Sequence, residues 1–326
     1  MGSVAGERTE SGQLISPLDV ARHLRIRVPA TSANLGPGYD CMGMALGLYD
    51  SLEVSAAPRR DPSQSAVEIV VDGEGQADLP TDASHLVASL ISSILGQRGF
   101  HLPDLQVQAR NAIPHARGLG SSAAAVATAV AVADALLPQG LSADEQLQIG
   151  SRIEGHPDNY APALRGGLAV SWESGGSFCT APLSVHPQVR AVVAVPDFVQ
   201  STRVARGLLP ESVPHADAAQ NSGRSALLVH ALTSAPEFLL AATEDYLHQQ
   251  YRRGAFVEAM ALVDRLRLAG HAAVISGAGP TVLVLCPEED AAQSAVGAVE
   301  EYAGDTFAPR ILPISGSGVT VEEYQR

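Results

Sequence analysis

A glycine-rich stretch near the middle of the chain has the residue types of an anion-binding loop. It reads "PHARGLGSSAAAVATAVAVADAL" over residues 114–136, with two glycines and two serines before a long run of alanine and valine. Gly118 and Gly120 permit backbone conformations in which successive N–H groups converge on one anion. We expect Ser121 or Ser122 to cap the following helix, whose N-terminus attracts negative charge. Taken alone, the stretch is also typical of a tight turn that packs two elements closely.

The charged residues restrict how this chain can hold an anion. The 326 residues carry a formal net charge of −14, and all 21 basic residues are arginine. Without a lysine, the chain has neither the lysine of a nucleotide-binding P-loop nor a Schiff-base nucleophile. The acidic balance argues against nucleic acid or an anionic membrane as a partner. Phosphate must therefore be held by backbone amides, by arginine or by a metal ion.

Three other stretches contain similar chemistry. Residues 28–50, "VPATSANLGPGYDCMGMALGLYD", gather hydroxyl, amide and carboxylate side chains around glycines directly after a strand-like run. Residues 275–285, "ISGAGPTVLVL", place a Gly-Ala-Gly-Pro turn between two apolar runs, and residues 154–159 read "EGHPDN". The ordered set "PATSANLGPGYD", "GLGSSAA" and "SGAGPT" resembles the signature of the GHMP small-molecule kinases. With "EGHPDN", the chain resembles the homoserine kinase branch from about residue 26 to near its C-terminus.

This resemblance implies a fold and a reaction. The fold would be α+β, with a ribosomal-protein-S5-like N-terminal α/β domain and a ferredoxin-like C-terminal domain. The reaction would be ATP-dependent phosphorylation of the side-chain hydroxyl of L-homoserine, a step of threonine biosynthesis, with ATP and Mg²⁺ as cofactors. Two alternatives stay open: a GHMP kinase for a sugar or isoprenoid alcohol, and a catalytically silent relative that binds a ligand.

The resemblance also implies roles for individual residues. The residues implied in ATP binding surround the phosphate loop: Pro114, Arg117, Gly118, Leu119, Gly120, Ser121, Ser122 and Ala123. His85, where the family commonly has Asn, precedes the helix that lines the adenine pocket, and Ser122 and Glu154 match ligands of Mg²⁺. The residues implied in substrate binding are Asn34, Asp40, His156, Asp158, Asn159, Arg206 and Arg252. Of these, the residues implied in catalysis are Asn159, Asn34 and Arg206.

The residue types themselves suit an amino-acid substrate that ends in a hydroxyl. Asp40 suits the ammonium group, and a pair of arginines suits the carboxylate. Asn159 can hydrogen-bond the reacting hydroxyl without abstracting its proton, whereas related kinases often have an Asp at this position as a base. We therefore expect direct proton transfer from the hydroxyl toward the γ-phosphate, because phosphoryl transfer depends mainly on positioning and electrostatics.

A structural role stays open for several of these residues. Asp40 is also typical of a turn, and Asp158 after a proline is typical of an Asx-type cap. His156 suits a structural hydrogen bond as well as a substrate contact. Isolated arginines such as Arg206 and Arg252 are usually members of surface ion pairs.

The elements that must position these residues alternate irregularly, which favours an α+β fold over a wound parallel sheet. Apolar periodicity and caps predict helices over residues 84–97, 122–137, 142–154, 217–234, 236–251, 255–269 and 288–302. Ser142 and Glu145 form a capping box, and Pro138 ends the alanine-rich helix. We expect a polar extension at residues 1–24, an ATP-binding domain at 25–176 and a C-terminal domain at 177–326.

The cysteines and the apolar runs indicate where the protein works. Cys41, Cys179 and Cys286 lie far apart without CxxC spacing, so we expect buried thiols and neither a disulfide framework nor a zinc site. The N-terminus lacks a basic and an apolar signal region, and no apolar run reaches the roughly 18 residues of a membrane span. These features favour the cytoplasm, and family habit suggests a homodimer.

Overall fold

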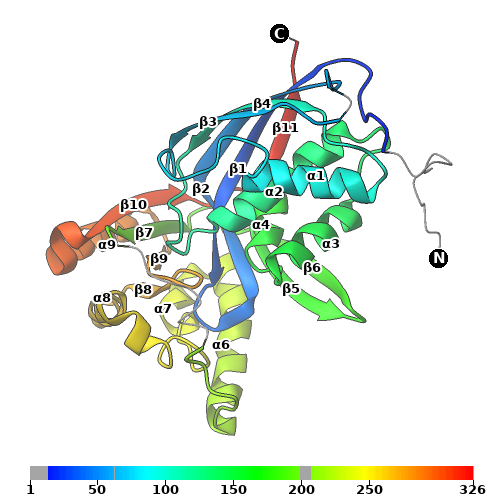
Figure 1. Cartoon of the computed structure of the whole chain (residues 1–326). Coiled ribbons are helices and arrows are strands. Elements are labelled where there is room, and N and C mark those ends of the chain that lie inside the picture. The colour runs from blue at the N-terminus through cyan, green and yellow to red at the C-terminus, as the bar shows by residue number, and fades with distance from the viewer. Residues whose placement is uncertain (1–13, 62, 199–206, 326) are drawn as a thin grey trace.

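A computed structural model describes residues 14–61, 63–198 and 207–325 of the chain (Figure 1). The larger of its two sheets has seven strands in the order β11-β1-β2-β4-β3, with β5 paired to β2 and β6 paired to β5. The strands of this sheet are β1 Arg22–Asn34, β2 Gly38–Ala57, β3 Val67–Gly73, β4 Asp104–Asn111, β5 Leu168–Ser174, β6 Ser177–Leu183 and β11 Thr320–Glu323. The β3–β4 pair is parallel and the other pairs are antiparallel.

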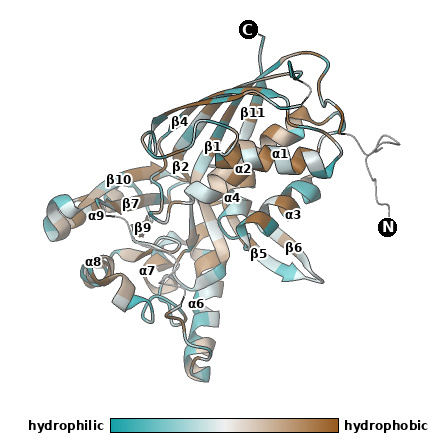
Figure 2. Cartoon of the chain, in the orientation of Figure 1, coloured by the Kyte–Doolittle hydropathy of each residue, from teal (hydrophilic) through white to brown (hydrophobic). Residues whose placement is uncertain are grey.

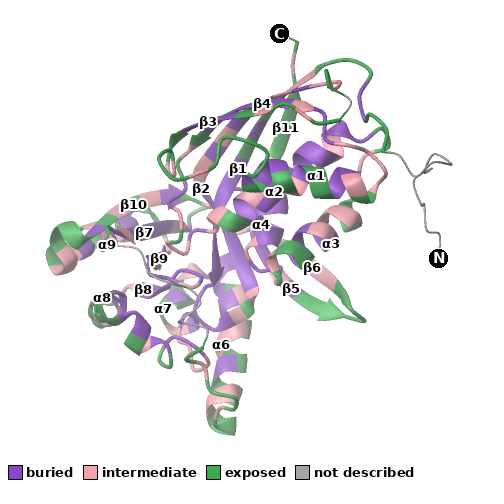
Figure 3. Cartoon of the chain, in the orientation of Figure 1, coloured by how far each residue is buried: buried purple, intermediate pink, exposed green. Residues whose placement is uncertain are grey.

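Helix α2 is the central helix of this half of the molecule. Its run of alanine and valine is buried on nearly every face, and the short side chains let it lie close to β1. The helices packed around α2 are α1 Leu86–Gln97, α3 Ala143–Glu154 and α4 Tyr160–Arg165, with α2 itself at Ser121–Leu136. Figure 2 shows brown bands on α1 and α2, and Figure 3 shows α2 largely purple. The helix that begins at the predicted phosphate loop is therefore rigidly held.

The smaller sheet has four antiparallel strands in the order β10-β7-β9-β8. Its elements are β7 Arg190–Pro196, α8 Val257–Leu268, β8 Ala272–Ile275, β9 Val282–Cys286, α9 Glu289–Ala303 and β10 Phe307–Pro313. This β-α-β-β-α-β sequence confirms the expected ferredoxin-like unit. Helices α6 His215–Thr233 and α7 Leu239–Ala242 lie between β7 and α8 in the chain.

The two halves share a hydrophobic core. Successive residues of a strand point to opposite faces, and in β7 Ala191 and Val193 join the core of the large sheet. Val192 and Ala194 point the other way and pack in a second cluster with α8 and α9. The small sheet is therefore buried on both faces, which matches the nearly continuous apolar sequence of β7.

The β1–β2 hairpin carries the "TSANLGPGYD" motif across the molecule. Its outer half pairs with β4 and β11, and its inner half extends toward the small sheet (Figure 1). The turn at residues 34–38 lies against α6, where Asn221 Nδ2 and Ser225 Oγ both donate to the Pro37 carbonyl. Gly36 adopts φ 86°, and a Cβ there would lie 2.6 Å from the Thr243 carbonyl oxygen. The hairpin thus connects the two halves at the site.

Most predicted helices are confirmed, but the segment at residues 236–251 is not one helix. It forms a 3-10 turn at Pro236–Phe238 and the short α7, and turns follow from Thr243 onward. The Asp245 carboxylate accepts hydrogen bonds from the backbone N–H groups of Leu247, His248 and Gln249. This local bonding replaces helical hydrogen bonds at residues 247–249, so the helix does not continue past α7.

The predicted domain boundary lies inside a hairpin. Residue 176 is in the turn between β5 and β6, and both strands belong to the large sheet. The chain also returns to this sheet at its end, where β11 pairs with β1. The division into two independent domains stays a prediction. If the domains were divided by sheet, β6 and β11 would both belong to the N-terminal domain, which contains the large sheet.

The cysteines are unpaired, as expected, but they are not all buried. Cys286 is buried, whereas Cys41 and Cys179 are partly exposed because they lie at the start of β2 and in the β5–β6 hairpin. Within the described residues, no helix is long and apolar enough to cross a membrane.

Candidate active site

The phosphate loop places two glycines in the left-handed region directly before α2. Gly118 has φ 80° and Gly120 has φ 69°, and Gly120 is the N-cap residue of the helix. The predicted serine cap is wrong, because the N-cap residue is Gly120, which has no side chain, and the Ser122 hydroxyl donates to Glu154. Among the described residues, the N–H groups of Gly118, Leu119 and Gly120 donate to no other group. The loop therefore presents N–H groups that can donate hydrogen bonds to an anion.

The third motif forms the floor of this loop. Ser276 Oγ donates to the Gly118 carbonyl at 2.6 Å, and Thr281 N donates to the Arg117 carbonyl at 3.2 Å. A Cβ at Gly118 would lie 2.3 Å from the Ser276 carbonyl oxygen. Glycine at 118 is thus required both by the backbone conformation and by this close approach.

The first motif packs beside the loop. Thr31 N donates to the Leu119 carbonyl at 3.1 Å, and Gly277 N donates to the Ala33 carbonyl at 3.0 Å. Asn34 at φ 69° uses both ends of its amide: Nδ2 donates to the Gly277 carbonyl, and Oδ1 accepts from Asp40 N. The structure gives Asn34 the task of joining the first and third motifs, and its contact with substrate stays a prediction.

Thr31 connects the phosphate loop to Asn159, and sequence reasoning gave it no role. Its buried hydroxyl donates to Asn159 Oδ1 at 3.0 Å. A Cβ at Gly120 would lie 1.9 Å from the same hydroxyl oxygen, so the loop backbone rests directly on Thr31. With Oδ1 occupied, the Asn159 amide has its N–H₂ group left to donate. The sequence indicates a role for Thr31 only through the position of its hydroxyl near the glycines of the first motif.

The "HPDN" residues form a hydrogen-bonded turn before α4. His156 Nδ1 lies 2.6 Å from Asp158 Oδ1, and the same oxygen accepts from Asn159 N at 2.8 Å. Asp158 is buried, so these bonds hold the turn and agree with its interpretation as a structural carboxylate. Burial, with Asp158 and Asp40 nearby, raises the pKa of the Cys41 thiol. The negative potential at this thiol suits an ammonium group close by.

Ser122 and Glu154 lie together as expected of a shared metal site. Ser122 Oγ donates to Glu154 Oε1 at 2.6 Å, and both side chains are accessible at the mouth of the loop. A hydroxyl and a carboxylate are hard oxygen ligands, and Mg²⁺ typically takes one or two protein oxygens together with phosphate oxygens and water. The pair fits Mg²⁺ in chemistry. No cluster of three or more His, Cys, Asp or Glu suited to a metal exists in the described part of the chain.

A cavity of about 280 Å³ opens beside the start of α2. It is lined by His85 and Leu79 on one side and by Ser121 and Ser122 on the other. His85 Nδ1 accepts from Val87 N and caps α1, and burial, together with nearby His115, lowers the pKa of this imidazole. The structure therefore places His85 in a cavity next to the phosphate loop, with a capping role in addition.

Arg252 reaches the site from the other half of the molecule. It is buried, its Nη2 lies 3.4 Å from the Tyr39 hydroxyl, and its Nη1 lies 3.4 Å from His248 Nδ1. In the part of the chain that the structure describes, Arg252 Nε has no hydrogen-bond partner. Asp40 follows Tyr39 and is exposed with φ 53°. A surface ion pair for Arg252 is thus wrong, because this guanidinium is buried and pairs with no carboxylate of the described residues.

Three remaining predictions concern Arg117, its neighbours and Arg206. Arg117 donates from Nε to the Phe198 carbonyl at 2.9 Å and from Nη2 to the Asp197 carbonyl. These bonds tie the loop to the end of β7, and a phosphate contact of Arg117 stays a prediction. Pro114 and Ala123 are buried on either side of the loop. Arg206 lies outside the described residues.

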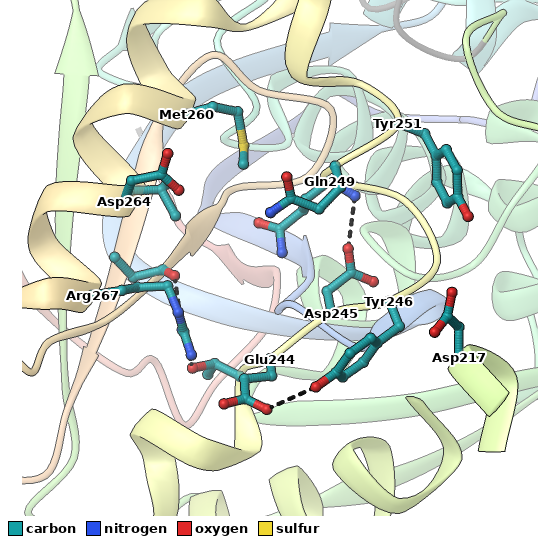
Figure 4. Close-up of a pocket in the computed structure, with 13 residues that line it drawn as sticks. Asp217, Glu244, Asp245, Tyr246, Gln249, Tyr251, Met260, Asp264 and Arg267 are labelled. Carbon is teal, nitrogen blue, oxygen red and sulfur yellow. Dashed lines mark hydrogen bonds between the residues drawn. The ribbon is translucent and has the colours of Figure 1, made fainter. Parts of the chain in front are cut away.

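A larger cavity of about 430 Å³ is lined in part by Gln249, Gln250 and Tyr251, the three residues before Arg252 (Figure 4). Two of its carboxylates are paired at its edge, Glu244 with Arg224 at 2.6 Å and Asp264 with Arg253 at 2.7 Å. Sequence analysis predicted no functional residue at this cavity.

Family comparisons agree with the site. The model of the GHMP kinases N terminal domain matches residues 85–167, and that of the GHMP kinases C terminal domain matches residues 225–305. A homoserine kinase of Streptomyces avermitilis is 45% identical over 311 residues, covering 94% of this chain and 98% of its own. A homoserine kinase of Clavibacter michiganensis is 45% identical over 309 residues, covering 94% and 96%.

Solved structures extend the likeness to the fold. The homoserine kinase of Cytophaga hutchinsonii superimposes with a TM-score of 0.79 at 23% identity, covering 92% of this chain and 97% of its own. A mevalonate diphosphate decarboxylase of Enterococcus faecalis has a TM-score of 0.65 at 16% identity, covering 94% of this chain and the whole of its own. The three interlocked motifs, both family models and relatives matched over nearly their whole length show that this chain belongs to the GHMP kinases and, within them, to the homoserine kinase family.

Proposed function

We propose that this protein transfers the γ-phosphoryl group of ATP to the side-chain hydroxyl of L-homoserine and forms O-phospho-L-homoserine, a step toward threonine. The proposal rests chiefly on the hydrogen bond from Thr31 to Asn159, because it puts a candidate hydroxyl contact directly against the phosphate loop. The name shared by the relatives supports the choice of substrate.

ATP would lie along the start of α2. The base would occupy the cavity that His85 lines, and the phosphates would accept hydrogen bonds from the amides of residues 118–122. Backbone N–H groups supply these hydrogen bonds, so no lysine is needed to bind phosphate, although the protein has a net charge of −14. Ser122 and Glu154 would hold Mg²⁺, which neutralises charge on the phosphate oxygens when bound.

L-Homoserine would lie between the loop and the Arg252 side. The buried guanidinium of Arg252 suits the carboxylate, and Asp40, with the negative region around Cys41, suits the ammonium. Asn159 would then donate its N–H to the reacting hydroxyl oxygen or to the phosphoryl oxygen. Because Asn159 cannot take a proton, the hydroxyl proton would pass to the phosphoryl group, and the protein would contribute positioning and charge stabilisation.

The test is ADP release with Mg-ATP against L-homoserine, D-homoserine, mevalonate, galactose and shikimate. We expect turnover with L-homoserine alone, and we expect Arg252→Ala to raise the KM for homoserine strongly. Turnover with mevalonate or galactose would instead support a kinase for another alcohol. Binding of homoserine without any turnover would support a silent relative.

Asn159→Asp tests the proton route. We expect this variant to be slower than the wild type, because a carboxylate beside the transferring phosphoryl group adds repulsion where the amide donates. A faster enzyme with a new acidic limb in its pH profile would show that a general base at this position speeds the reaction and would contradict direct proton transfer to the phosphoryl group.

Two further expectations, action in the cytoplasm and assembly as a homodimer, stay predictions.

A further inference from the structure

The segment of residues 245–252 has a fixed shape that presents Arg252 to the site. The Asp245 side chain is almost fully buried and accepts from the N–H groups of three following residues, the shortest bond being 2.7 Å from Gln249 N. Figure 4 shows Asp245 pointing toward this nitrogen. Gln249 Oε1 in turn accepts from Ile275 N at 2.7 Å, next to the third motif. The segment is thus anchored before it reaches Arg252.

His248 lies at the centre of this segment and contacts both sides of the proposed substrate site. Its Nε2 lies 2.8 Å from the Gly36 carbonyl oxygen, and its Nδ1 lies 3.4 Å from Arg252 Nη1. Its ring lies 5.1 Å from the Tyr39 ring, next to Asp40. Its side chain is 1% exposed. No role for His248 followed from the sequence motifs.

The partners of the imidazole define its tautomer. A carbonyl oxygen only accepts, so Nε2 carries the proton, and a guanidinium only donates, so Nδ1 has none. Asp245 Oδ1 at 3.7 Å from Nε2 favours the same arrangement. Burial, the largest influence, lowers the pKa of His248, although Asp245 and Asp40 oppose the shift and Arg252 adds to it. A neutral imidazole therefore donates to the first motif and accepts from Arg252.

These contacts orient Arg252 but do not occupy all of its N–H donors. Its bonds to His248 and Tyr39 are long, and its buried Nε has no partner among the residues described. A buried guanidinium with unused N–H groups is costly unless a ligand completes it. The unpartnered Nε is the group that a substrate carboxylate would complete.

We propose that His248 is a positioning residue, which aims Arg252 at the substrate carboxylate through Nδ1 and holds the Gly36–Asp40 turn in place through Nε2. The inference rests on the proposed function, since it assigns Arg252 to the carboxylate of homoserine. It adds a residue that acts through Arg252 and not on the reacting atoms.

Two substitutions separate the two halves of this role. In His248→Asn, the amide oxygen takes the place of Nδ1 and still accepts from Arg252, but the donor to Gly36 is lost. In His248→Gln, the amide nitrogen takes the place of Nε2 and still donates to Gly36, but the acceptor for Arg252 is lost. His230→Gln, at an exposed position on α6, is the control and should leave activity unchanged.

We expect His248→Gln to raise the KM for L-homoserine about 10-fold or more, because hydrogen bonds to charged groups are worth about 1.5–3 kcal/mol. Its kcat should change less, and its KM for ATP should stay within about 2-fold. His248→Asn should keep a KM for homoserine much nearer the wild type. Equal KM values in the two variants, or a larger effect in His248→Asn, would overturn the proposal.

A substrate without the carboxylate distinguishes aiming from a general loss of structure. 3-Amino-1-propanol has the hydroxyl and the ammonium of homoserine but nothing for Arg252 to bind. We expect kcat/KM for this alcohol to be nearly equal in wild type and His248→Gln. An equal fold-loss with both substrates would show that His248 supports the fold only, and the aiming role would be wrong.

The same experiment keeps the two proposals apart. If the wild type releases no ADP with homoserine, the proposed function fails on that result. The dissociation constants of L-homoserine for the wild type and both variants, measured by calorimetry, then decide the role of His248 by the same expected order. No measurable binding of homoserine to the wild type would overturn both proposals.

Discussion

Thr31 shows how one hydroxyl can set the chemistry of a neighbouring amide. The hydroxyl has a single proton, and donation to Asn159 Oδ1 leaves the amide nitrogen of Asn159 to face the site. Thr31 also lies directly beneath Gly120, so the phosphate loop and the amide share one support. In the proposed reaction, the loop that would hold the phosphates and the amide that would hold the acceptor hydroxyl are therefore supported by the same buried side chain.

Removal of this hydroxyl should slow the chemical step. We expect Thr31→Val, which keeps the shape, to lower kcat about 10-fold, because an uncompensated Asn159 oxygen costs about 1–3 kcal/mol and lets the amide rotate. Thr31→Ser keeps the hydroxyl and should recover most of the rate. Steady-state ADP release measures both, and equal rates in wild type and Thr31→Val would show that the hydrogen bond has no catalytic consequence.

At the scale of elements, glycines decide how closely the motif segments approach. Gly43 of β2 packs on the "HPDN" turn, and a Cβ there would lie 1.7 Å from the Asp158 carbonyl oxygen. Gly96 of α1 is a matched control, since nothing lies within 4 Å of a Cβ at that position. Replacing each glycine by alanine therefore distinguishes the effect of a steric clash from the ordinary effect of adding a methyl group.

We expect Gly43→Ala to lower the free energy of unfolding by about 1–3 kcal/mol and also to lower kcat, because overpacking displaces the turn that carries Asn159. Gly96→Ala should raise the free energy of unfolding by about 0.4–1 kcal/mol, since alanine favours a helix. Denaturant unfolding measures both changes. A Gly43→Ala protein as stable as the wild type would contradict the close approach of β2 and the turn.

The capping box of α3 predicts a pH effect. Hydrogen bonds from Ser142 and Arg98 lower the pKa of Glu145 from its ordinary value near 4.5 to about 2. A lowered folded-state pKa means that the ionised carboxylate stabilises the fold above pH 4.5, and that this contribution is lost as the pH falls from 4.5 to 2.

Glu145→Gln keeps the backbone hydrogen bond and removes the charge. We expect it to lower the free energy of unfolding at pH 7 by less than about 1 kcal/mol, because the pair with Arg98 is exposed to solvent. The difference from wild type should shrink between pH 4.5 and 2 in denaturant unfolding. A difference that stays constant over this range would show that the charge has no part in it.

Local signals in the sequence predicted the helices and strands well, but they did not predict the contacts between distant segments. The capping box, the end of α2 before Pro138 and the ferredoxin-like order of strands and helices are confirmed. The helix expected at residues 236–251 is interrupted by the Asp245 side chain, and sequence periodicity cannot register that bond. Asn34, Thr31 and His248 each have a hydrogen-bond partner in a segment more than a hundred residues away. Motif spacing therefore predicted the glycine loop before α2 but not the side chains that support it.

For the whole molecule, the C-terminal segment returns to the large sheet and adds an edge strand to it. Strand β11 pairs with β1, Val319 N donates to the Ala163 carbonyl at 2.7 Å, and Gly318 lies against the backbone at Leu164. The composition of the last ten residues gave no sign of a strand, because the four residues of β11 are all exposed.

Deletion of residues 317–326 tests how much this edge strand contributes to stability. We expect the deletion to lower the free energy of unfolding by about 3 kcal/mol or more, because it removes a strand and the contacts to α4. Glu323→Gln, which removes only the ion pair with Arg22, should change it by less than about 1 kcal/mol. Calorimetric melting compares the two, and a deletion variant that melts with the wild type would show that β11 contributes nothing to stability.

If Asn159 holds the homoserine hydroxyl against the phosphate loop, phosphoryl transfer must form an ester of that hydroxyl. Phosphorus NMR of a mixture of enzyme, Mg-ATP and L-homoserine tests it most directly. We expect ADP and a phosphate ester of the homoserine hydroxyl to appear in equal amounts, and we expect Thr31→Val to form both far more slowly. ADP accompanied only by inorganic phosphate, or unchanged ATP with wild-type enzyme, would contradict it.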